Sequence, residues 1–517
     1  MKKLTYFIVI LIFLIPTLIG YLTNRDMLFS GLSTTDGNTY LSFMNQAKEG
    51  KLLFTNMYTS EDVPYIMFRP TYLIAGWVSY ITRLPNIVVY HLFRIIGIIL
   101  FLYFLEKIVS LYFRDKKERF LTLLICIFAS GIGFFFKFLT LFGIKQYGSI
   151  DLSITDANNF LLLMAHPHTI FSIALMAASV YYFLKWNKDP KPRYIAYSAF
   201  FSFTLGFEHL FDVITIYLVI GLFMIDQFIS QKRIDWNRIK HLILFVLITA
   251  LPFIYTYIMF TMPSFSDWNT QNALDTPKFL HVMFGYGFMF FSFLAVLLYC
   301  ILNYKKINPE TKFMLYWIAA VLILIYSPFN MQRRFFEGAH IPFGIITGIF
   351  LFLILRPYLN SKFSKKIPVT IIVLILISLL PTNIYHFYNK TINIDNGRGN
   401  DPYAVNNYIY PKEHEALLWL KDNSEPGSIV ISTYNIGNYI PSYMNQRVYL
   451  GHWAQTIDFE QKTIDIENYF KGINNITLQK PAYVWYGVDE KILNPDFSLS
   501  NSEKIFENSK VTLYKLK

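Results

Sequence analysis

The residues whose types and spacing could perform chemistry begin in a polar segment near the start of the chain. Asp36 is followed four residues later by Tyr40, and Arg69 precedes Pro70 further along the same segment. A positioned carboxylate can act as a general base that takes a proton from a hydroxyl group. Asp36 is therefore the candidate base, and the alternative interpretation is a solvated aspartate in an Asp36-Gly37 turn.

Two adjacent arginines form a second candidate site. Arg333 and Arg334 lie between two apolar stretches, with Glu337 and His340 close by in the sequence. The planar guanidinium group forms forked hydrogen bonds with phosphate oxygens, so binding of a lipid phosphate or pyrophosphate is one interpretation of the pair. Anchoring to the headgroups of membrane lipids is the other interpretation.

Histidines and carboxylates gather at two further places where polar segments meet apolar stretches. His166 and His168 lie at one of them, and Glu208, His209 and Asp212 lie at the other. If the second segment is helical, Glu208 and Asp212 share a helix face, because they are four residues apart. Lining or capping of a cavity is the preferred interpretation of both groups. A divalent metal is the alternative, but the spacing identifies none, so the cofactor is unknown.

The elements that must position these residues are apolar stretches of nearly membrane-spanning length. The chain of 517 residues is 54% hydrophobic and only 15% charged, which excludes a soluble globular protein. A spanning helix needs ~20 apolar residues. The sequence therefore predicts a polytopic α-helical membrane protein with about eleven transmembrane helices, at 4–22, 86–112, 120–142, 160–184, 194–207, 210–229, 242–262, 282–302, 313–328, 339–355 and 367–387.

The net charge of +12 does not indicate a nucleic-acid-binding protein, because the cations are located in the loops between apolar stretches. They occur in alternate loops, as the positive-inside rule requires of cytoplasmic loops. The basic clusters lie at 2–3, 114–119, 185–193, 232–240, 305–312 and 356–366. We therefore predict a multi-pass protein of the plasma membrane, with the N-terminus in the cytoplasm and the C-terminal domain outside it.

Two long polar segments lie on the predicted outer side. The first is the outer loop at 23–85, and it contains an apolar helix at 68–82 that suits the membrane interface. The second follows a transmembrane core at 1–388 and consists of a linker at 389–402 and a small α/β domain at 403–517. Within that domain the sequence predicts helices at 412–422 and 459–470 and strands at 428–433, 482–486 and 510–515.

The first outer loop carries an ordered set of features. A first span is followed by Asp36, Tyr40, Gly50, Arg69-Pro70 at the start of the interfacial helix, and Arg83-Leu84-Pro85 before the second span. This order resembles the GT-C superfamily of lipid-linked sugar transferases, which includes aminoarabinose transferases, protein mannosyltransferases and oligosaccharyltransferases. The resemblance covers the N-terminal half of the chain, and the later spans match in topology.

The resemblance implies roles for individual residues. It places the catalytic carboxylate on Asp36 and a contact to the lipid phosphate on Arg69. Relatives often carry Lys followed by two prolines at the latter position, and here Thr71 stands in place of the second proline. The residues predicted to bind substrate are Tyr40, Arg69, His166, His168, Glu208, His209, Arg333 and Arg334.

Other polar residues on the outer side have less specific interpretations. His452 and Trp453, with Thr456, Asp458 and Lys462, form either a rim that faces carbohydrate or a buried aromatic side chain followed by a capped helix. Solvation is the default interpretation of four aspartates, and binding of sugar hydroxyls is the alternative: Asp151, Asp156, Asp267 and Asp275.

The expected function is therefore that of an inverting membrane glycosyltransferase for a hexose or a pentose. Its donor would be a polyprenyl-phosphate sugar, its acceptor an extracytoplasmic glycan, lipid or protein, and its surroundings membrane lipids, with no nucleic acid. A transporter or flippase of lipid-linked glycans, or a polymerase of them, is the alternative. The sequence leaves open the sugar, the acceptor and the oligomeric state.

Overall fold

The computed structural model places the chain in two compact units. The helical unit comprises Met1–Phe13, Arg94–Tyr257 and Ala273–Tyr388, and the loop–tail unit comprises Leu14–Phe93, Ile258–Asn272 and Asn389–Lys517. Residues 393–402 of the predicted linker, and Asp267, lie outside the described residues. The structure describes residues 2–23, 26–31, 36–145, 147–262, 264–265, 273–304, 307–364, 366–392, 406–478, 481–500 and 502–517.

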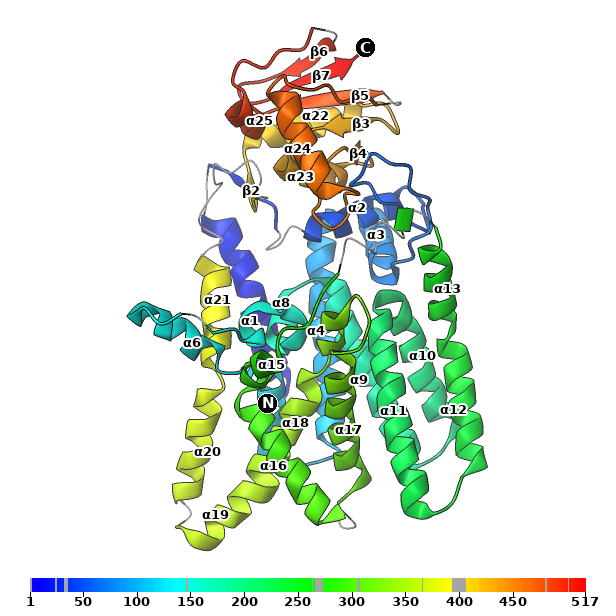
Figure 1. The fold of residues 1–517 in the computed structure, drawn as a ribbon, viewed down its shortest axis with the longest axis vertical. Helices are drawn as coiled ribbons and strands as arrows, with labels where there is room; N and C mark the ends of the chain where they lie inside the picture. The colour runs from blue at the N-terminus through cyan, green and yellow to red at the C-terminus, as the bar shows by residue number, and fades with distance from the viewer. Residues whose placement is uncertain are drawn as a thin grey trace. The chain divides into compact units, whose positions relative to one another are not determined.

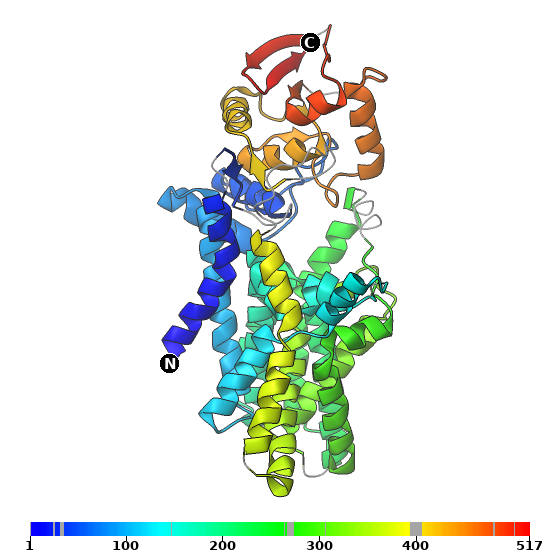
Figure 2. The ribbon, with the colours of Figure 1, turned by 90° about the vertical axis from the view of Figure 1, so that its left-hand side faces the viewer.

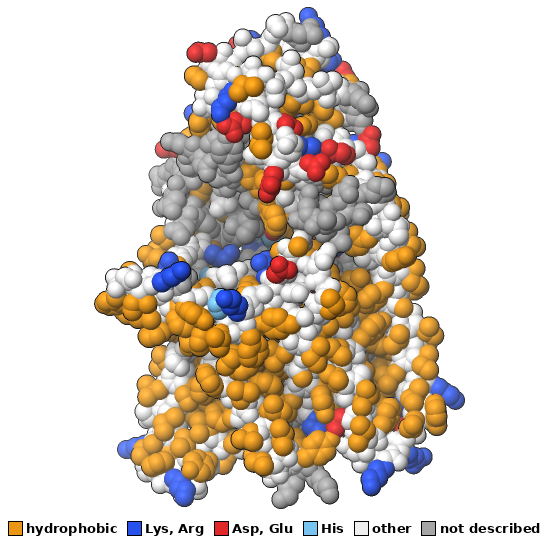
Figure 3. All heavy atoms as spheres, in the orientation of Figure 1, with side chains coloured by type: hydrophobic (Ala, Val, Ile, Leu, Met, Phe, Trp, Pro, Cys, Tyr) orange, Lys and Arg blue, Asp and Glu red, His pale blue; other side chains and the backbone are white. Residues whose placement is uncertain are grey.

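The helical unit consists of long apolar helices joined by short polar turns (Figures 1 and 2). Figure 3 shows hydrophobic side chains over most of its visible surface, as expected of helices that face lipid. Helix α4 begins in the loop–tail unit, and helices α1 and α13 end in it. The helices are α1 (Lys2–Thr23), α4 (Asn86–Val109), α5 (Lys116–Phe128), α6 (Gly133–Leu139), α7 (Ile150–Ser153), α8 (Asn159–Met164), α9 (Pro167–Lys188), α10 (Pro192–Glu208), α11 (Leu210–Gln231), α12 (Trp236–Thr249), α13 (Leu251–Phe260), α15 (Phe279–Tyr286), α16 (Phe288–Leu302), α17 (Pro309–Leu324), α18 (His340–Ile349), α19 (Arg356–Lys362), α20 (Lys366–Ser378) and α21 (Pro381–Ile392), with short turns η1 (Thr140–Phe142), η2 (Thr155–Ala157), η4 (Gln332–Phe336) and η5 (Phe350–Leu355).

Fewer of the described helices have the length and composition of a membrane span than the eleven stretches that the sequence predicts. All eleven apolar stretches contain helix, but among the described residues only seven helices are long and apolar enough to cross a membrane, or nine if each of two bent pairs is one span. The bent pairs are α5 with α6–η1 and α15 with α16. Helices α10 and α17 have 17 and 16 residues. At 1.5 Å per residue they reach ~24–26 Å, which is less than the ~30 Å of a hydrocarbon core.

Small residues allow close helix packing inside this unit. A Cβ atom added to Gly344 in α18 would lie 2.6 Å from Sγ of Cys126 in α5, and one on Gly348 would lie 2.4 Å from Oγ1 of Thr122. Helices in lipid pack through such small residues because their backbones can then approach closely. Cys126 is fully buried in this packing.

The loop–tail unit contains a five-stranded sheet with helices around it (Figure 1). The strand order is β4-β3-β5-β7-β6, with β3 parallel to β4 and β5, and β7 antiparallel to β5 and β6. The predicted helix at 459–470 and strand at 482–486 are confirmed, and the other predicted elements of this domain differ by a few residues at their ends. The elements are β1 (Leu28–Phe29), α2 (Asp36–Lys48), α3 (Pro70–Thr82), β2 (Tyr408–Ile409), α22 (Pro411–Asn423), β3 (Ile429–Ile431), α23 (Tyr434–Tyr443), β4 (Arg447–Val448), α24 (Phe459–Phe470), β5 (Ala482–Tyr486), α25 (Val488–Leu493), β6 (Ser502–Glu507) and β7 (Thr512–Leu516).

The first outer loop folds together with the C-terminal tail. Strand β1 pairs with β2, which precedes the tail sheet by a single helix. Asn38 in α2 donates to the side chain of Asn438 at 2.6 Å, and Asn56 donates to the backbone of Gln455 at 2.6 Å. Both of these loop side chains are buried. Because buried amides need partners, these contacts fix the loop against the tail.

Candidate functional site

The carboxylate of Asp36 lies at the start of α2, where the helix dipole favours negative charge. Its Oδ1 is 3.0 Å from Nε2 of His452, which comes from the tail. The Asp36 side chain is 40% exposed, whereas that of His452 is only 3% exposed. The carboxylate of the candidate base is therefore bound by a buried histidine and remains accessible to solvent.

The orientation of the His452 ring is fixed by its second nitrogen. Nδ1 accepts a hydrogen bond from the backbone N–H of Ala454 at 3.1 Å, so the neutral ring carries its proton on Nε2 and donates to Asp36. The backbone N–H of His452 donates to Oγ1 of Thr456 at 3.1 Å, and the ring of Tyr58 contacts the imidazole edge to face. Sequence reasoning assigned His452 to a rim or to a packed interior and missed its pairing with Asp36, which lies 416 residues away.

Two other predicted residues of the first loop lie at the junction of α2 and α3. The ring of Tyr40 stacks on that of Tyr72, with centroids 4.7 Å apart and planes inclined by 6°. Arg69 is half-buried and occupies the position before the first turn of α3, where Pro70 begins the helix as predicted. Both residues therefore belong to the same unit as Asp36.

A second contact between the tail and the first loop is made by Lys462 in α24, which follows His452 in the sequence. Its Nζ lies 2.6 Å from Oε1 of Glu61 and donates to the hydroxyls of Thr59 and Ser60 at 3.2 and 3.1 Å. Burial lowers the pKa of Lys462, while the contacts with Glu61 oppose this shift. Lys462 therefore does not face carbohydrate on a rim. Its side chain is almost fully buried against the first loop.

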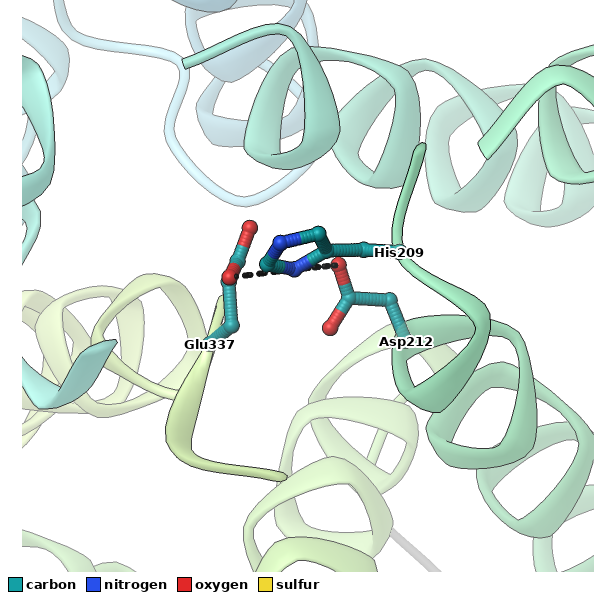
Figure 4. Close-up of side chains that lie close together, drawn as sticks. All are labelled: His209, Asp212 and Glu337. Carbon is teal, nitrogen blue, oxygen red and sulfur yellow. Dashed lines mark ion pairs between the residues drawn. The ribbon is translucent and has the colours of Figure 1, made fainter. Parts of the chain in front are cut away.

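A separate cluster of titratable side chains lies in the helical unit, where α10 ends and α11 begins (Figure 4). His209 occupies the break between these helices. Its Nδ1 is 2.7 Å from Oε2 of Glu337 and 3.8 Å from Oδ2 of Asp212. Figure 4 shows the imidazole ring between the two carboxylates. We call His209, Asp212 and Glu337 the carboxylate–histidine cluster.

The two carboxylates of this cluster are fully buried, and His209 is 11% exposed. Within the described part of the chain, the four oxygens of Asp212 and Glu337 have no hydrogen-bond partner. Nδ1 of His209 lies 2.7 Å from Oε2 of Glu337, which is short enough for a hydrogen bond. The angle between the two groups does not suit one, and Nδ1 has no hydrogen-bond partner among the described residues. Buried carboxylates usually accept several hydrogen bonds, so this arrangement is unusual.

Of the other predicted residues, His168 lies next to the carboxylate–histidine cluster. The rings of His166 and His168 are stacked with centroids 5.9 Å apart, and the ring of His168 is 5.5 Å from that of His209. Glu208, the last residue of α10, is 3% exposed. The structure therefore brings together the two groups of histidines that the sequence places at different loops.

The paired arginines lie in the short turn η4. Arg334 donates from Nη1 to Oδ1 of Asp156 at 3.1 Å, and Nε of Arg333 is 3.9 Å from Oδ2 of the same carboxylate. Both arginine side chains are 35% exposed, whereas that of Asp156 is 6% exposed. The expectation that Asp156 is solvated is wrong, because the two guanidinium groups neutralise it where η2 packs against η4. The predicted neighbour His340 is also buried, and its Nδ1 accepts from the backbone of Asn159 at 3.3 Å.

The fold is that of the GT-C glycosyltransferases, although no family model and no curated protein matches the sequence. The chain is similar to ArnT from Cupriavidus metallidurans bound to undecaprenyl phosphate, with a TM-score of 0.54, 11% identity and coverage of 99% of this chain and 98% of that one. It is also similar to the oligosaccharyltransferase from Archaeoglobus fulgidus tethered to an acceptor peptide. There the TM-score is 0.52, the identity 13%, and the coverage 92% of this chain and 68% of the other.

Proposed function

We propose that this protein transfers a sugar from a polyprenyl-phosphate donor to an extracytoplasmic glycan, lipid or protein. The observation that carries the proposal is the half-exposed carboxylate of Asp36, held 3.0 Å from a buried histidine. The similarity to ArnT with undecaprenyl phosphate bound extends over 99% of this chain and supports a lipid-linked donor. The N-terminus would lie in the cytoplasm and the loop–tail unit outside it.

The reaction assigns one role to Asp36. An acceptor hydroxyl attacks the anomeric carbon of the donor, and its proton moves to the carboxylate of Asp36 as the new C–O bond forms. The bond between the anomeric carbon and the phosphate oxygen breaks, and the electron pair leaves with the polyprenyl phosphate. A single displacement of this kind inverts the anomeric configuration. His452 keeps the carboxylate oriented by donating to Oδ1.

The leaving group is already an anion, so the donor site needs cations more than it needs a general acid. We propose that Arg69, Arg333 and Arg334 supply them. Arg333 and Arg334 also bind Asp156, but a third of each side chain stays exposed and available to phosphate oxygens. Hydrogen bonds between charged groups are worth ~1.5–3 kcal/mol each. Residues that would line the substrate site are Tyr40, His166, His168, Glu208 and His209.

The proposal is tested by removing the base while keeping its shape. Asp36→Asn should lower transfer from radiolabelled polyprenyl-phosphate hexoses and pentoses by ~10² to 10⁴-fold, the usual contribution of a general base. Glu49→Gln is the matched control, because it removes an exposed carboxylate from the same loop one residue after α2 ends. Transfer by the control should equal that of the unchanged protein at matched protein level.

Two results would overturn the proposal. Undiminished transfer by Asp36→Asn would remove this residue as the base. Movement of labelled lipid across a vesicle membrane without any transfer by the unchanged protein would identify a flippase, and growth of a lipid-linked glycan chain would identify a polymerase. Donor lipid and product should therefore be separated and counted in both leaflets.

A further inference from the structure

The geometry points to a divalent metal site in the helical unit, with His209 Nδ1, Asp212 and Glu337 as its three protein ligands. One ligand atom from each residue lies within 4.8 Å of the other two. An imidazole nitrogen with two carboxylate oxygens is a donor set that suits Zn²⁺ and, among harder ions, Mn²⁺. We propose that the site binds one such ion.

The distances between the ligand atoms are compatible with a single ion. Bonds of 2.0–2.1 Å in a tetrahedral site separate neighbouring ligand atoms by about 3.3 Å. The separations from Nδ1 of His209 are 2.7 Å to Glu337 and 3.8 Å to Asp212, on either side of that value. The ring nitrogen and both carboxylates therefore converge on one small region rather than pairing as donor and acceptor (Figure 4).

The charges also call for a cation. Two carboxylates that are fully removed from solvent and lack hydrogen-bond donors would each cost several kcal/mol to keep ionised. Glu337 and Asp156 repel a negative charge on Asp212, whereas Arg334 attracts it. Arg334 is already bonded to Asp156. Only His209 lies within ion-pair distance of both cluster carboxylates among the described residues. A divalent ion would neutralise both.

The backbone positions two of the three ligands, His209 and Glu337. His209 has an extended backbone conformation, φ −144°, and interrupts the helical path between α10 and α11. Glu337 is followed by Gly338 at φ +76°, where an added Cβ would lie 2.2 Å from Sδ of Met176. Only glycine fits there without strain. Three protein ligands leave one tetrahedral position for water or for an anionic oxygen such as that of a phosphate.

Metal binding is measured on the purified full-length protein in detergent, stripped with EDTA and dialysed against Zn²⁺ or Mn²⁺. The unchanged protein should retain about one equivalent of metal per chain. Asp212→Asn and Glu337→Gln should each weaken Zn²⁺ binding by more than the ~10 to 100-fold that loss of an outer-shell partner costs. Asp151→Asn is the matched control: it removes a buried carboxylate of the same unit whose donors are Ser149 and the backbone of Gly133.

Folding and metal binding are separated by a second readout. Each variant is first shown to elute as the unchanged protein does, and Co²⁺ is then added, because its visible absorption reports a nitrogen and oxygen ligand set directly. Loss of the Co²⁺ spectrum in a folded Asp212→Asn protein, with the spectrum intact in Asp151→Asn, supports the site. An unchanged protein that retains no metal, or variants that retain as much as it does, would overturn it. No sugar donor is present, so the outcome is independent of transfer activity.

Discussion

The two units hold their carboxylates in opposite ways. In the loop–tail unit, Asp36 is 40% exposed and receives a hydrogen bond from a buried histidine. In the helical unit, Asp212 and Glu337 are fully buried and have no hydrogen-bond partner among the described residues, although a histidine lies between them. The same pair of residue types, a carboxylate and an imidazole, therefore occurs in two different environments.

The difference indicates two different tasks. A carboxylate that exchanges a proton with a substrate has to meet solvent and be held in one orientation, and Asp36 satisfies both conditions. Carboxylates that stay buried without donors are stable in the ionised form only beside a cation. The environment of each carboxylate, more than its residue type, supports the proposed roles of Asp36 as a base and of Asp212 and Glu337 as metal ligands.

The largest effect is expected at the histidine that holds Asp36. His452→Ala should lower transfer by ~10²-fold and should cost little more in a protein that already carries Asp36→Asn, because the two residues act as a unit. The pH dependence of kcat/KM should shift in the single variant. His414→Ala is the control, since it removes a tail histidine that instead contacts Tyr443. Additive losses in the double variant would show that His452 acts independently of Asp36.

The arginine pair gives the next largest effect. Changing Arg333 and Arg334 together to Ala should weaken binding of a polyprenyl-phosphate donor by at least ~10-fold, because each charge-assisted contact is worth ~1.5–3 kcal/mol. Arg356→Ala is the control, because it breaks a comparable ion pair with Glu118 in the same unit. Adding Asp156→Asn to the double variant should restore its thermal stability but not its donor binding. Restored or undiminished donor binding would limit the arginines to neutralising Asp156 or to contacting lipid headgroups.

The contact between loop and tail is tested through Lys462. Lys462→Met should lower the free energy of unfolding of the loop–tail unit by about 2 kcal/mol, since it leaves Glu61, Thr59 and Ser60 without their shared donor. Lys471→Met, at the end of the same helix, removes an exposed pair with Glu467 and should cost under about 0.5 kcal/mol. Urea unfolding followed by tryptophan fluorescence measures both, and equal losses would contradict the assignment of Lys462 as the link.

The same link has a predictable pH dependence. Burial raises the pKa of Glu61, but the hydrogen bonds from Lys462 and Thr59 outweigh this effect and hold the pKa below its ordinary value. The contribution of Glu61 is therefore present above pH ~4.5 and is lost as the pH falls through the folded-state pKa. The difference in the free energy of unfolding between the unchanged protein and Lys462→Met should therefore become smaller as the pH falls below ~4.5.

The smallest effect concerns a buried carboxylate that does have donors. Glu490 accepts from the backbone of Thr433 and Gly487 at 2.7 and 2.9 Å, and burial and the neighbouring Asp489 raise its pKa to about 7. A raised folded-state pKa stabilises the protein below the unfolded value and loses that stabilisation as the pH rises through about 7. The loop–tail unit should be more stable at pH 5 than at pH 8 by ~1–2 kcal/mol. Persistence of this difference in Glu490→Gln would assign it to another group.

Local patterns in the sequence were sufficient for much of the fold. The helix at 459–470 and the strand at 482–486 follow from periodicity within a few residues, and the start of α3 follows from Pro70. Helix α23 was missed because Gly437 and Pro441 disfavour helix. The tertiary structure requires a small residue at 437, where a Cβ would lie 2.0 Å from the carbonyl oxygen of Leu450.

The candidate sites were predictable as residues but not as arrangements. Asp36, His209 and Arg334 were chosen as candidates from residue type, spacing and the family resemblance, whereas Asp36 and Arg334 have partners that lie far away in the sequence. His452 is 416 residues from Asp36, and Asp156 is 178 residues from Arg334. Periodicity and spacing carry no signal over such separations, because the contacts depend on how complete elements pack.

The contact between the first loop and the tail also determines when, during synthesis, the side chain of Asp36 can become ordered. Asp36 emerges early in synthesis, but His452 follows 416 residues later. At ~5–20 residues per second, the ribosome needs about 20 to 80 s to cover that distance. During this interval the first loop lacks the tail residues that orient Asp36 and that form hydrogen bonds with Asn38 and Tyr58. In the proposed mechanism, a nascent or truncated chain would therefore lack an ordered Asp36, and activity would begin only once the tail has folded against the loop.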